Sequence, residues 1–217
     1  MSDHYRKLIN FVYEKIKHIK EPSILELGVR EGVSTKMFIE LCEKNSGNLY
    51  SIDINDYKSV SNSKRWNFIQ SRDDNFASLK NKIPKKFDII FLDTLHEAQH
   101  VKKIFYYYYK FLKSDGFFFI DDTSWLPYVK KNYRDLFYAE INNQETFEML
   151  LKIYFSNYQN FDLEFFFVSS GFALAKKLNN NELKPPKKIL SRKLGIKNLV
   201  RKILKIFHFY KACSSNH

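Results

Sequence analysis

Carboxylates and one histidine follow two short apolar runs of this sequence. Asp93 and His96 come after the first run, and Asp121 and Asp122 come directly after the second. Three carboxylates brought to one place repel one another unless they are protonated or neutralised, and a divalent cation neutralises them. Oxygen ligands favour magnesium, calcium or manganese over zinc. We therefore predict a site for a cation, with Mg²⁺ as the expected ion, at Asp93, Asp121 and Asp122. The alternative is that the aspartate pair caps a helix and His96 is a surface residue.

The elements that must position these side chains are a strand, a helix and a second strand. The apolar runs at residues 87–92 and 117–120 are predicted to be buried strands, and residues 97–112 have apolar side chains at helical spacing. Residues 114–116, Ser-Asp-Gly, are expected to close the helix. Such a crossover makes the strands parallel and right-handed, so that both carboxyl ends reach one edge of the sheet. Ligands of open α/β sheets bind at that edge.

Two glycines flank the turn after the first predicted strand. Residues 23–28 form this strand, and a helix follows through Glu43, with Gly28 and Gly32 in the turn. Glycine permits unusual backbone angles and lets a ligand approach the main chain, while the helix N-terminus offers free N–H groups. An ordinary tight turn explains the same spacing. Glu26, at a position where a dinucleotide site has a glycine, favours a ligand that carries positive charge over a pyrophosphate.

An acidic residue also ends the second predicted strand. Residues 48–53 close with Asp53, which lies 25 residues after Gly28. At about this offset an acidic side chain accepts hydrogen bonds from ribose hydroxyls. A helix cap is the alternative, and we favour the ribose role.

Three further side chains near the expected edge have two interpretations each. Asp73 and Asp74 follow a short strand at residues 66–70, and either could meet an adenine amino group or start the helix at residues 76–82. Trp125, in the loop after the acidic pair, could line an acceptor pocket or fill the core. The sequence leaves these alternatives open.

The rest of the body supplies covering helices and a closing hairpin. Residues 1–20 contain an amphipathic helix, whose apolar positions begin near Tyr5, and a second helix is expected at residues 145–158. Residues 163–168 and 171–175 are predicted to form an antiparallel hairpin.

Composition indicates a folded protein of one domain with an appendage. The chain has 217 residues, of which 44% are hydrophobic, and only two are cysteines, Cys42 and Cys213. Two distant cysteines make neither a disulfide framework nor a zinc site. The sequence has no apolar stretch near the roughly 20 residues of a membrane span and no signal-peptide core. We expect a cytoplasmic protein.

Positive charge is concentrated at the C-terminal end. The net charge is +12, and ten lysines and arginines follow Leu183 with no Asp or Glu among them, which leaves +2 for residues 1–182. The body therefore gives no sign of nucleic-acid binding. Residues 189–210 place apolar side chains on one helical face and cations on the other, which is typical of a segment at an anionic membrane surface. Docking onto a partner subunit or onto the body are the alternatives, so a homo-oligomer remains open.

These motifs together resemble the class I S-adenosylmethionine-dependent methyltransferases over residues 20–177, and they look most like the metal-dependent macrocin-type sugar O-methyltransferases. The matching stretches are Glu26 to Ser34 (Glu-Leu-Gly-Val-Arg-Glu-Gly-Val-Ser), Asp53, Asp93 to His96 (Asp-Thr-Leu-His), and the pair Asp121-Asp122. The resemblance implies a doubly wound, Rossmann-like α/β fold with a mostly parallel seven-stranded sheet and an antiparallel C-terminal hairpin. The methyltransferase domain is expected at 1–178. Three asparagines at 179–181 and two prolines at 185–186 predict a linker at 179–188, and the basic amphipathic tail then covers 189–217.

The resemblance also implies roles for individual residues. The loop with Glu26, Gly28, Gly32 and Ser34 would hold the methionine part of S-adenosylmethionine. The other cofactor contacts would come from Asp53, Asp73 and Asp93. Asp93, Asp121 and Asp122 would bind magnesium, and His96 or Asp93 would take a proton. Thr94 and Ala98 depart from the family pattern, in which glycine and an aromatic residue are common, so the acceptor side of the pocket is expected to differ.

We therefore expect a metal-assisted O-methyltransferase that acts on a hydroxyl of a sugar or cell-envelope glycan, at the inner face of the membrane if the tail binds lipid. The alternative is a relative of the same fold that binds a cofactor without methylating, such as a cephalosporin hydroxylase-like protein, because fold alone does not fix chemistry.

Overall fold

The protein is described from a computed structural model, which defines residues 3–123, 137–167, 170–188, 196 and 198–205. Trp125 lies outside these described residues. The chain divides into two compact units, Met1–Pro186 and Lys187–His217. We call the first unit the body and the second the tail, and we treat each by itself.

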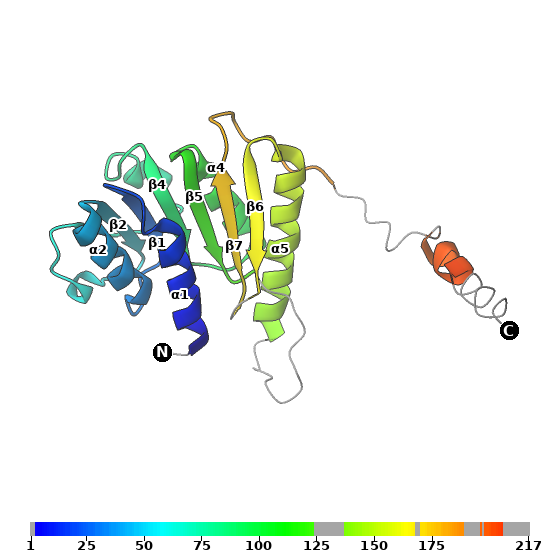
Figure 1. The fold of residues 1–217 in the computed structure, drawn as a ribbon, viewed down its shortest axis with the longest axis horizontal. Coiled ribbons are helices and arrows are strands. Elements are labelled where there is room, and N and C mark those ends of the chain that lie inside the picture. The colour runs from blue at the N-terminus through cyan, green and yellow to red at the C-terminus, as the bar shows by residue number, and fades with distance from the viewer. Residues whose placement is uncertain (1–2, 124–136, 168–169, 189–195, 197, 206–217) are drawn as a thin grey trace. The chain divides into compact units, whose positions relative to one another are not determined.

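The body contains one seven-stranded sheet with the strand order β3-β2-β1-β4-β5-β7-β6 (Figure 1). All neighbouring strands pair in parallel except β7, which is antiparallel to both β5 and β6. The predicted doubly wound, mostly parallel sheet with an antiparallel C-terminal hairpin is thus confirmed. The strands are β1 (Ser23–Leu27), β2 (Asn48–Asp53), β3 (Trp66–Gln70), β4 (Phe87–Leu92), β5 (Leu112–Asp121), β6 (Phe161–Phe166) and β7 (Phe172–Lys177).

Helices cover both faces of this sheet, and Figure 1 shows α1 on one face and α4 on the other. One buried cluster joins α1 and α2 to the sheet, for example through Ile16 and Phe38 against Phe91. A second cluster joins α3, α4 and α5 to the opposite face, with Phe105 of α4 against Phe118 of β5. The helical segments are α1 (Asp3–Ile16), α2 (Val33–Asn45), the 3-10 turn η1 (Lys58–Val60), α3 (Phe76–Leu79), α4 (Ala98–Tyr109) and α5 (Phe137–Asn157).

Strand register brings the carboxyl ends of the parallel strands to one edge. Leu27 at the end of β1 pairs with Ile52 on one side and with Leu92 on the other, and Leu92 pairs with Ile120. The residues that follow these strands therefore share one rim of the sheet, as right-handed parallel crossovers require.

The segment between α4 and β5 differs from its prediction. The helix ends at Tyr109 instead of Leu112, and residues 114–116 belong to β5 rather than to a helix terminus. A buried amine lies at this ending, where Lys177 Nζ donates hydrogen bonds to the carbonyl oxygens of Tyr109 (3.3 Å) and Leu112 (2.7 Å). Leu112 pairs with Phe87, and the register shifts before Phe117 pairs with Ile89, so the polar residues form a bulge within the strand.

Two other helices also differ from their predicted bounds. Helix α5 begins at Phe137, eight residues before the predicted start, while α3 is a single turn and not the predicted helix to Lys82. The residues of the expected linker contact the body, since Asn157 exchanges hydrogen bonds with the backbone N–H and carbonyl of Lys184.

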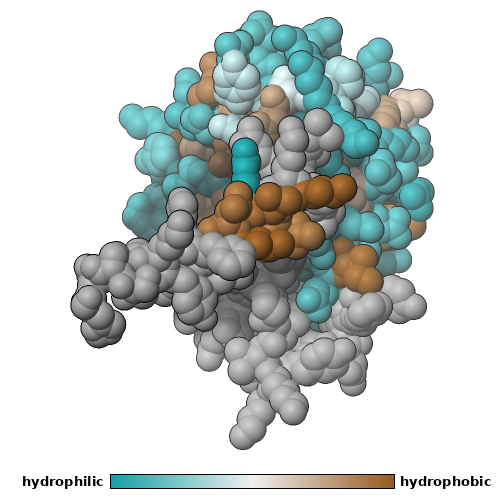
Figure 2. Space-filling view, turned by 90° about the vertical axis from the view of Figure 1, so that its right-hand side faces the viewer, coloured by the Kyte–Doolittle hydropathy of each residue, from teal (hydrophilic) through white to brown (hydrophobic). Residues whose placement is uncertain are grey.

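Figure 2 shows one face of the molecule, on which hydrophilic residues predominate and hydrophobic residues gather in one area. Within the described residues, no helix has the length and apolar content needed to cross a bilayer.

Candidate functional site

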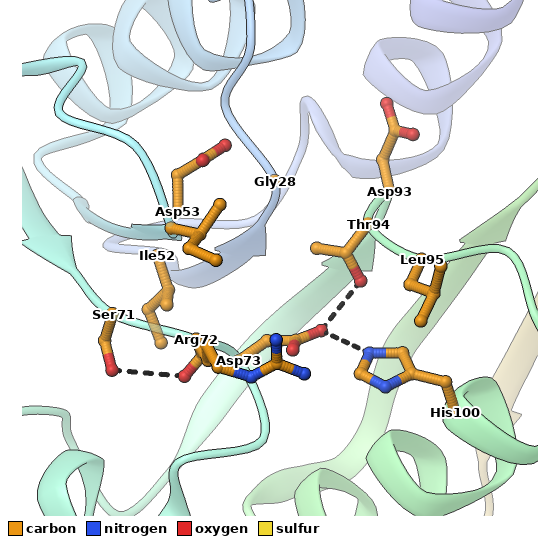
Figure 3. A pocket seen from close by; sticks show the side chains of 11 residues that line it. Gly28, Ile52, Asp53, Ser71, Arg72, Asp73, Asp93, Thr94, Leu95 and His100 are labelled. Atoms are coloured by element: carbon orange, nitrogen blue, oxygen red, sulfur yellow. Dashed lines mark hydrogen bonds and ion pairs between the residues drawn. The ribbon is translucent and has the colours of Figure 1, made fainter.

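A cavity of about 330 Å³ opens at the carboxyl edge of β1 to β4 (Figure 3). Its walls come from the residues that follow these strands and from the start of α4. They are Gly28, Ile52, Asp53, Ile54, Ser71, Arg72, Asp73, Asp93, Thr94, Leu95 and His100. A ligand in this cavity would meet backbone at the end of β1 and carboxylates at the ends of β2, β3 and β4.

Gly28 forms the point where the β1 loop and the end of β4 come closest. Its φ is +98°, and a Cβ atom built there would lie 1.9 Å from the carbonyl oxygen of Asp93. The two neighbouring backbones are tied by hydrogen bonds from Gly28 N–H to the Ile52 carbonyl (2.9 Å) and from Asp93 N–H to the Leu27 carbonyl (2.8 Å). Any residue with a side chain would push these strands apart, so glycine keeps the floor of the cavity open.

Gly32 closes the same loop, with φ at +72° immediately before α2. A Cβ atom there would lie 2.4 Å from Cγ1 of Val60, in the segment after β2. Gly32 is not one of the residues that line the cavity. In the structure, Gly32 allows the loop to turn into α2 close to Val60.

Asp53 ties the loop to the end of β2. Its Oδ2 atom accepts hydrogen bonds from the backbone N–H groups of Val29 (2.8 Å) and Arg30 (3.3 Å), and Oδ1 accepts one from Asn55 N–H (2.9 Å). A carboxylate has about four acceptor positions, so it retains capacity for a ligand hydroxyl. Asp53 also lines the cavity, where the ribose role was predicted.

Glu26 and Ser34 lie beneath the loop rather than in the cavity wall. Glu26 is fully buried and accepts hydrogen bonds from the hydroxyls of Ser34 (2.6 Å), Ser51 (2.6 Å) and Thr35 (2.9 Å). Burial raises the pKa of Glu26 to about 7, although the three hydroxyls oppose the shift. In the structure these side chains connect β1, β2 and α2 under the turn, and neither lines the cavity.

Asp73 and Asp74, for which the sequence gave the same two interpretations, have different surroundings in the structure. Asp73 is 8% exposed and lines the cavity. Asp74 points to the surface, where hydrogen bonds from Arg72 and Lys103 lower its pKa to about 2. Asn75 occupies the N-cap position of α3, so neither aspartate caps that helix.

Two exposed apolar side chains border the cavity, one after each of the strands that flank β1. Ile54 follows β2 and is 58% exposed, and Leu95 follows β4 and is 47% exposed. Figure 3 shows Leu95 beside Thr94 at one side of the cavity. Apolar side chains left in water at a concave site provide contacts for the flat faces of a nucleobase.

The predicted acidic residues meet next to this cavity. His96 Nε2 lies 3.2 Å from Oδ2 of Asp122 and 3.5 Å from Oδ1 of Asp93. Asp121, one residue earlier on β5, is 6% exposed, and its Oδ1 accepts the N–H of Asp122 (2.8 Å). Asp122 has φ at +57°, a left-handed conformation that is strained for a residue with a side chain. The four residues therefore come from two parallel strand ends, as expected.

The charges of this acidic cluster, which we define as Asp93, His96, Asp121 and Asp122, destabilise one another. Burial raises the pKa of Asp121 well above its usual value, and the carboxylates of Asp93 and Asp122 raise it further. Burial also raises the pKa of Asp93, while His96 opposes this shift. A cation bound among these oxygens would relieve both effects, and the donor set suits a hard ion such as Mg²⁺. Among the residues that the structure describes, no three His, Cys, Asp or Glu side chains are arranged as a ready-made metal site.

Sequence reasoning missed four residues of the cavity wall that bear on ligand binding. Thr94 was noted only as a departure from a family pattern, and no role was predicted for Ile54, Leu95 or His100. The position of each directly after a strand, or at the start of the following helix, is the signal that would have found them. His100 lies 27 residues from Asp73, its hydrogen-bond partner, so no local pattern connects the two.

Comparison with known proteins finds similarity to methyltransferases over part of this chain. A family model described as a methyltransferase domain matches residues 25–123. This match includes the last three residues of β1, strands β2 to β5, the cavity wall and the acidic cluster. No curated protein matches the chain.

Solved structures share the fold at low sequence identity. The MycE methyltransferase from the mycinamycin biosynthetic pathway, in complex with Mg, SAH and mycinamycin VI, aligns with a TM-score of 0.57 and 20% identity over 85% of this chain and 52% of that chain. The SAH-bound Podospora anserina methyltransferase PaMTH1 aligns with a TM-score of 0.63 and 18% identity over 82% and 80%. A putative caffeoyl-CoA O-methyltransferase from Staphylococcus aureus has a TM-score of 0.59 and 17% identity over 82% and 84%. The chain spans about half the length of MycE.

Proposed function

We propose that this chain is an S-adenosylmethionine-dependent O-methyltransferase whose reaction is assisted by a divalent cation. Residues 25–123 match a methyltransferase-domain model, and solved methyltransferases share the fold of the body. The observation that carries this proposal is the position of Asp93. It lines the cavity, where its backbone carbonyl lies against Gly28, and its carboxylate belongs to the acidic cluster. A cofactor site and an acceptor site that share one residue are suited to transfer of a group between two bound molecules.

The cavity wall fits the parts of the cofactor. Asp53 has acceptor capacity for the ribose hydroxyls at the end of β2. Ile54 and Leu95 offer apolar contacts for the base, and the open backbone at Gly28 leaves space beside β1. Glu26 holds the loop from below through Ser34, Thr35 and Ser51. Bound S-adenosylmethionine supplies an electrophilic methyl group.

Asp93, Asp121 and Asp122 are the residues that would hold the cation. A divalent cation supplies Lewis-acid stabilisation of an acceptor alkoxide. The Asp121 carboxylate is anchored by the Asp122 N–H, while the Asp93 and Asp122 carboxylates both reach His96. Their negative charge is the reason that this rim attracts a cation.

His96 is the residue that takes the acceptor proton in this proposal. Its side chain is 30% exposed, so an acceptor hydroxyl can approach it from solvent. Asp122 and Asp93 lie 3.2 and 3.5 Å from Nε2 and would orient the ring by accepting its N–H, which makes Nδ1 the atom that takes the proton. General base catalysis of this kind requires contact within hydrogen-bond reach of the hydroxyl.

We propose a hydroxyl of a sugar, or of a glycan of the cell envelope, as the acceptor. This is supported by the resemblance of the Asp93–His96 and Asp121–Asp122 motifs to macrocin-type sugar O-methyltransferases and by the fold shared with MycE, whose complex contains mycinamycin VI. The departures at Thr94 and Ala98 lie on the acceptor side of that pattern, so the acceptor itself is expected to differ.

Calorimetric titration with S-adenosylmethionine and S-adenosylhomocysteine tests the cofactor part of the proposal. We expect both to bind to the full-length protein. Incubation with S-adenosylmethionine, Mg²⁺ and extracts of envelope glycans, followed by mass spectrometry, should then detect a mass gain of one methylene unit. Binding without any methylated product would favour the non-methylating alternative, and absence of binding would reject both.

The tail supports a second proposal, concerning the partner of the protein. Helical residues Ile196, Leu199, Val200, Ile203 and Leu204 are 46–83% exposed and recur at i, i+3, i+4, i+7 and i+8, the pattern of one apolar face. Arg201, Lys202 and Lys205 are exposed as well, and no acidic residue follows Glu182. An anionic bilayer surface matches both properties, because it offers an apolar interior and negative headgroups together. We propose that the tail binds such a surface and brings the body to a membrane-associated acceptor.

Co-sedimentation of the full-length protein with vesicles tests the tail. We expect binding to phosphatidylglycerol-containing vesicles, weaker binding to pure phosphatidylcholine, and loss of binding in the double variant Leu199→Glu/Ile203→Glu. Phe155→Glu is the matched control, since it removes a 58% exposed apolar side chain from α5. Unchanged sedimentation of the double variant, or concentration-dependent self-association that this variant abolishes, would reject the lipid surface.

A further inference from the structure

A groove of about 590 Å³ runs along the solvent side of α4 and has no lining residue in common with the cavity at the strand ends. Three of the six side chains that line the groove are lysines and none is acidic. This part of the body therefore attracts anions, although residues 1–182 carry a net charge of only +2. The six residues recur at i, i+3, i+4, i+7, i+8 and i+11 and are Gln99, Lys102, Lys103, Tyr106, Tyr107 and Lys110.

Two of the three lysines keep their charge uncompensated. Lys103 Nζ lies 3.1 Å from Oδ2 of Asp74. In the part of the chain that the structure describes, neither Lys102 nor Lys110 forms an ion pair with a carboxylate. Lys86 adds a further cation at the end of the groove, since its Nζ lies 3.4 Å from the carbonyl oxygen of Lys110. Along the helix, Lys102 and Lys110 are about 12 Å apart, so they can contact separate anionic groups.

Aromatic rings lie between these cations. Tyr107 stacks on Phe76 of α3 with 3.6 Å between the ring centroids, and Lys110 Nζ lies 4.1 Å from the centre of the Tyr107 ring. Tyrosine and lysine each combine an apolar body with a polar tip, which suits the boundary between water and lipid headgroups. The groove therefore joins charges that attract lipid phosphates to rings that tolerate the headgroup layer.

The last residues of the body lie beside the same face of α4. The hydroxyl of Tyr106 donates a hydrogen bond to the carbonyl oxygen of Lys184 (2.6 Å), and the Lys184 N–H donates one to Oδ1 of Asn157 (2.7 Å). The described helical residues of the tail begin at Ile196, twelve residues after Lys184, a separation of at most about 40 Å for an extended chain. A tail that lies on a bilayer thus keeps this side of the body near the same surface.

We propose that the groove along α4 is a second membrane contact, in which Lys102 and Lys110 bind the phosphates of an anionic bilayer. This inference rests on the proposed function of the tail, and it adds an orientation. Membrane attachment through one weak signal is readily reversed, and a second basic contact makes it stable. With α4 against the headgroups, the rim that carries His96, two residues before the start of that helix, lies at the edge of the contact. An acceptor anchored in the lipid can then reach it.

A single-stranded nucleic acid also binds to lysines and aromatic rings, but it needs ring faces on which its bases can stack. Phe76 occupies one face of Tyr107, and the ammonium group of Lys110 lies over the ring as well. A stacked ring and an ammonium group at these distances cannot share one face, so neither face of Tyr107 is free for a base. A bilayer needs no such face, and the observations favour it.

Co-sedimentation of the full-length protein with phosphatidylglycerol-containing vesicles tests the groove. The variant is Lys102→Gln/Lys110→Gln, with the native tail. We expect vesicle affinity to fall about 25-fold, because each lysine near an anionic surface contributes about 5-fold. The difference from the native protein should shrink when the salt concentration rises from about 0.1 M to about 0.5 M.

Two further pairs of substitutions are controls. Lys36→Gln/Lys44→Gln removes the same charge from exposed positions of α2, which packs on the opposite face of the sheet, and should change vesicle affinity by less than about 2-fold, because the field of the bilayer is screened there. Lys102→Arg/Lys110→Arg retains the charge and should bind as the native protein does. All variants should keep the native affinity for S-adenosylhomocysteine and the native melting temperature, because these side chains lie outside the cavity wall.

The inference is overturned if Lys102→Gln/Lys110→Gln sediments like the native protein, if the two glutamine pairs weaken binding equally, or if the arginine pair loses binding as well. Weaker binding of the variant to a single-stranded oligonucleotide, with vesicle binding unchanged, would assign the groove to nucleic acid and overturn it too. Binding that survives Leu199→Glu/Ile203→Glu but not Lys102→Gln/Lys110→Gln rejects the proposed role of the tail and keeps the groove. A native protein that does not bind these vesicles rejects both. Failure to bind S-adenosylhomocysteine rejects the methyltransferase function alone.

Discussion

His96 Nε2 lies 3.2 Å from Oδ2 of Asp122, although the two residues are separated by a helix and a strand. This contact joins the loop after β4 to the loop after β5 and so completes the rim on which the proposed chemistry takes place. Asp122 itself has a left-handed backbone conformation, with φ at +57°. Strained positions of this kind persist where surrounding structure fixes them, often at functional sites.

The first prediction concerns the metal. Asp122→Asn should lower kcat at least about 100-fold, because a carboxylate ligand and the partner of His96 are lost together, while affinity for S-adenosylhomocysteine stays within about 2-fold. Chelator should abolish turnover of the native protein, and Mg²⁺ should restore it. Asp115→Asn is the control, since that exposed carboxylate pairs with Lys176 at the opposite end of the strand. Full activity in excess chelator would contradict a metal-assisted reaction.

The second prediction concerns the ribose contact. Asp53→Asn replaces a carboxylate that receives three backbone N–H groups with an amide that carries its own donors. We expect affinity for S-adenosylhomocysteine to fall about 10- to 100-fold by calorimetry. Asp56→Asn serves for comparison, because Asp56 accepts a backbone hydrogen bond in the same loop but does not line the cavity. Equal effects of the two substitutions would assign the loss to the loop instead of the ligand.

The third prediction concerns the close approach at Gly28. Gly28→Ala should destabilise the fold by at least about 1–3 kcal/mol, since it combines a positive φ with a Cβ atom 1.9 Å from the Asp93 carbonyl oxygen. It should also abolish cofactor binding. Gly47→Ala is a matched control, because its Cβ would meet the Pro22 carbonyl oxygen at 2.4 Å, away from the cavity. Cofactor binding retained by Gly28→Ala, measured by calorimetry at a temperature where the variant is folded, would be contrary to the proposed position of the cofactor.

The fourth prediction is a pH dependence of stability. Burial raises the pKa of Glu26 from 4.5 to about 7, so the folded state binds a proton more tightly than the unfolded state. The stabilisation is fully present below pH 4.5 and is lost as the pH rises through 7, a decrease of about 3 kcal/mol. Glu26→Gln should remove this component, because an amide does not titrate and the surrounding hydroxyls can rotate to accept from it.

Urea unfolding at pH 4.5 and pH 8 measures this difference. The native protein should lose stability between the two pH values relative to Glu26→Gln. Glu164→Gln, a substitution on the solvent-exposed side of β6, should change with pH as the native protein does. Parallel curves for the native protein and Glu26→Gln would show that the buried carboxyl keeps an ordinary pKa.

Much of the fold follows from local sequence patterns. Apolar runs that end in acidic residues located β1, β2, β4 and the end of β5, because side-chain periodicity and turn chemistry act over a few residues. The parallel crossover rule then predicted that Asp93 and Asp121 would meet at one edge, without any knowledge of side-chain contacts. The start of β5 escaped this reasoning. The amine of Lys177, 65 residues after Leu112, donates a hydrogen bond to the Leu112 carbonyl, a contact that no local pattern indicates.

For the site, the sequence by itself determined which residue types gather at the rim, since strand ends and glycine turns fix where Asp53, Asp93 and the Asp121–Asp122 pair emerge. Only the tertiary structure decided what each side chain faces. Asp73 and Asp74 are neighbours of identical chemistry, yet His100 and Thr94 hold one in the cavity while Arg72 and Lys103 hold the other at the surface. The physical reason is that these partners come from distant segments, and their contacts form only when the helices pack on the sheet.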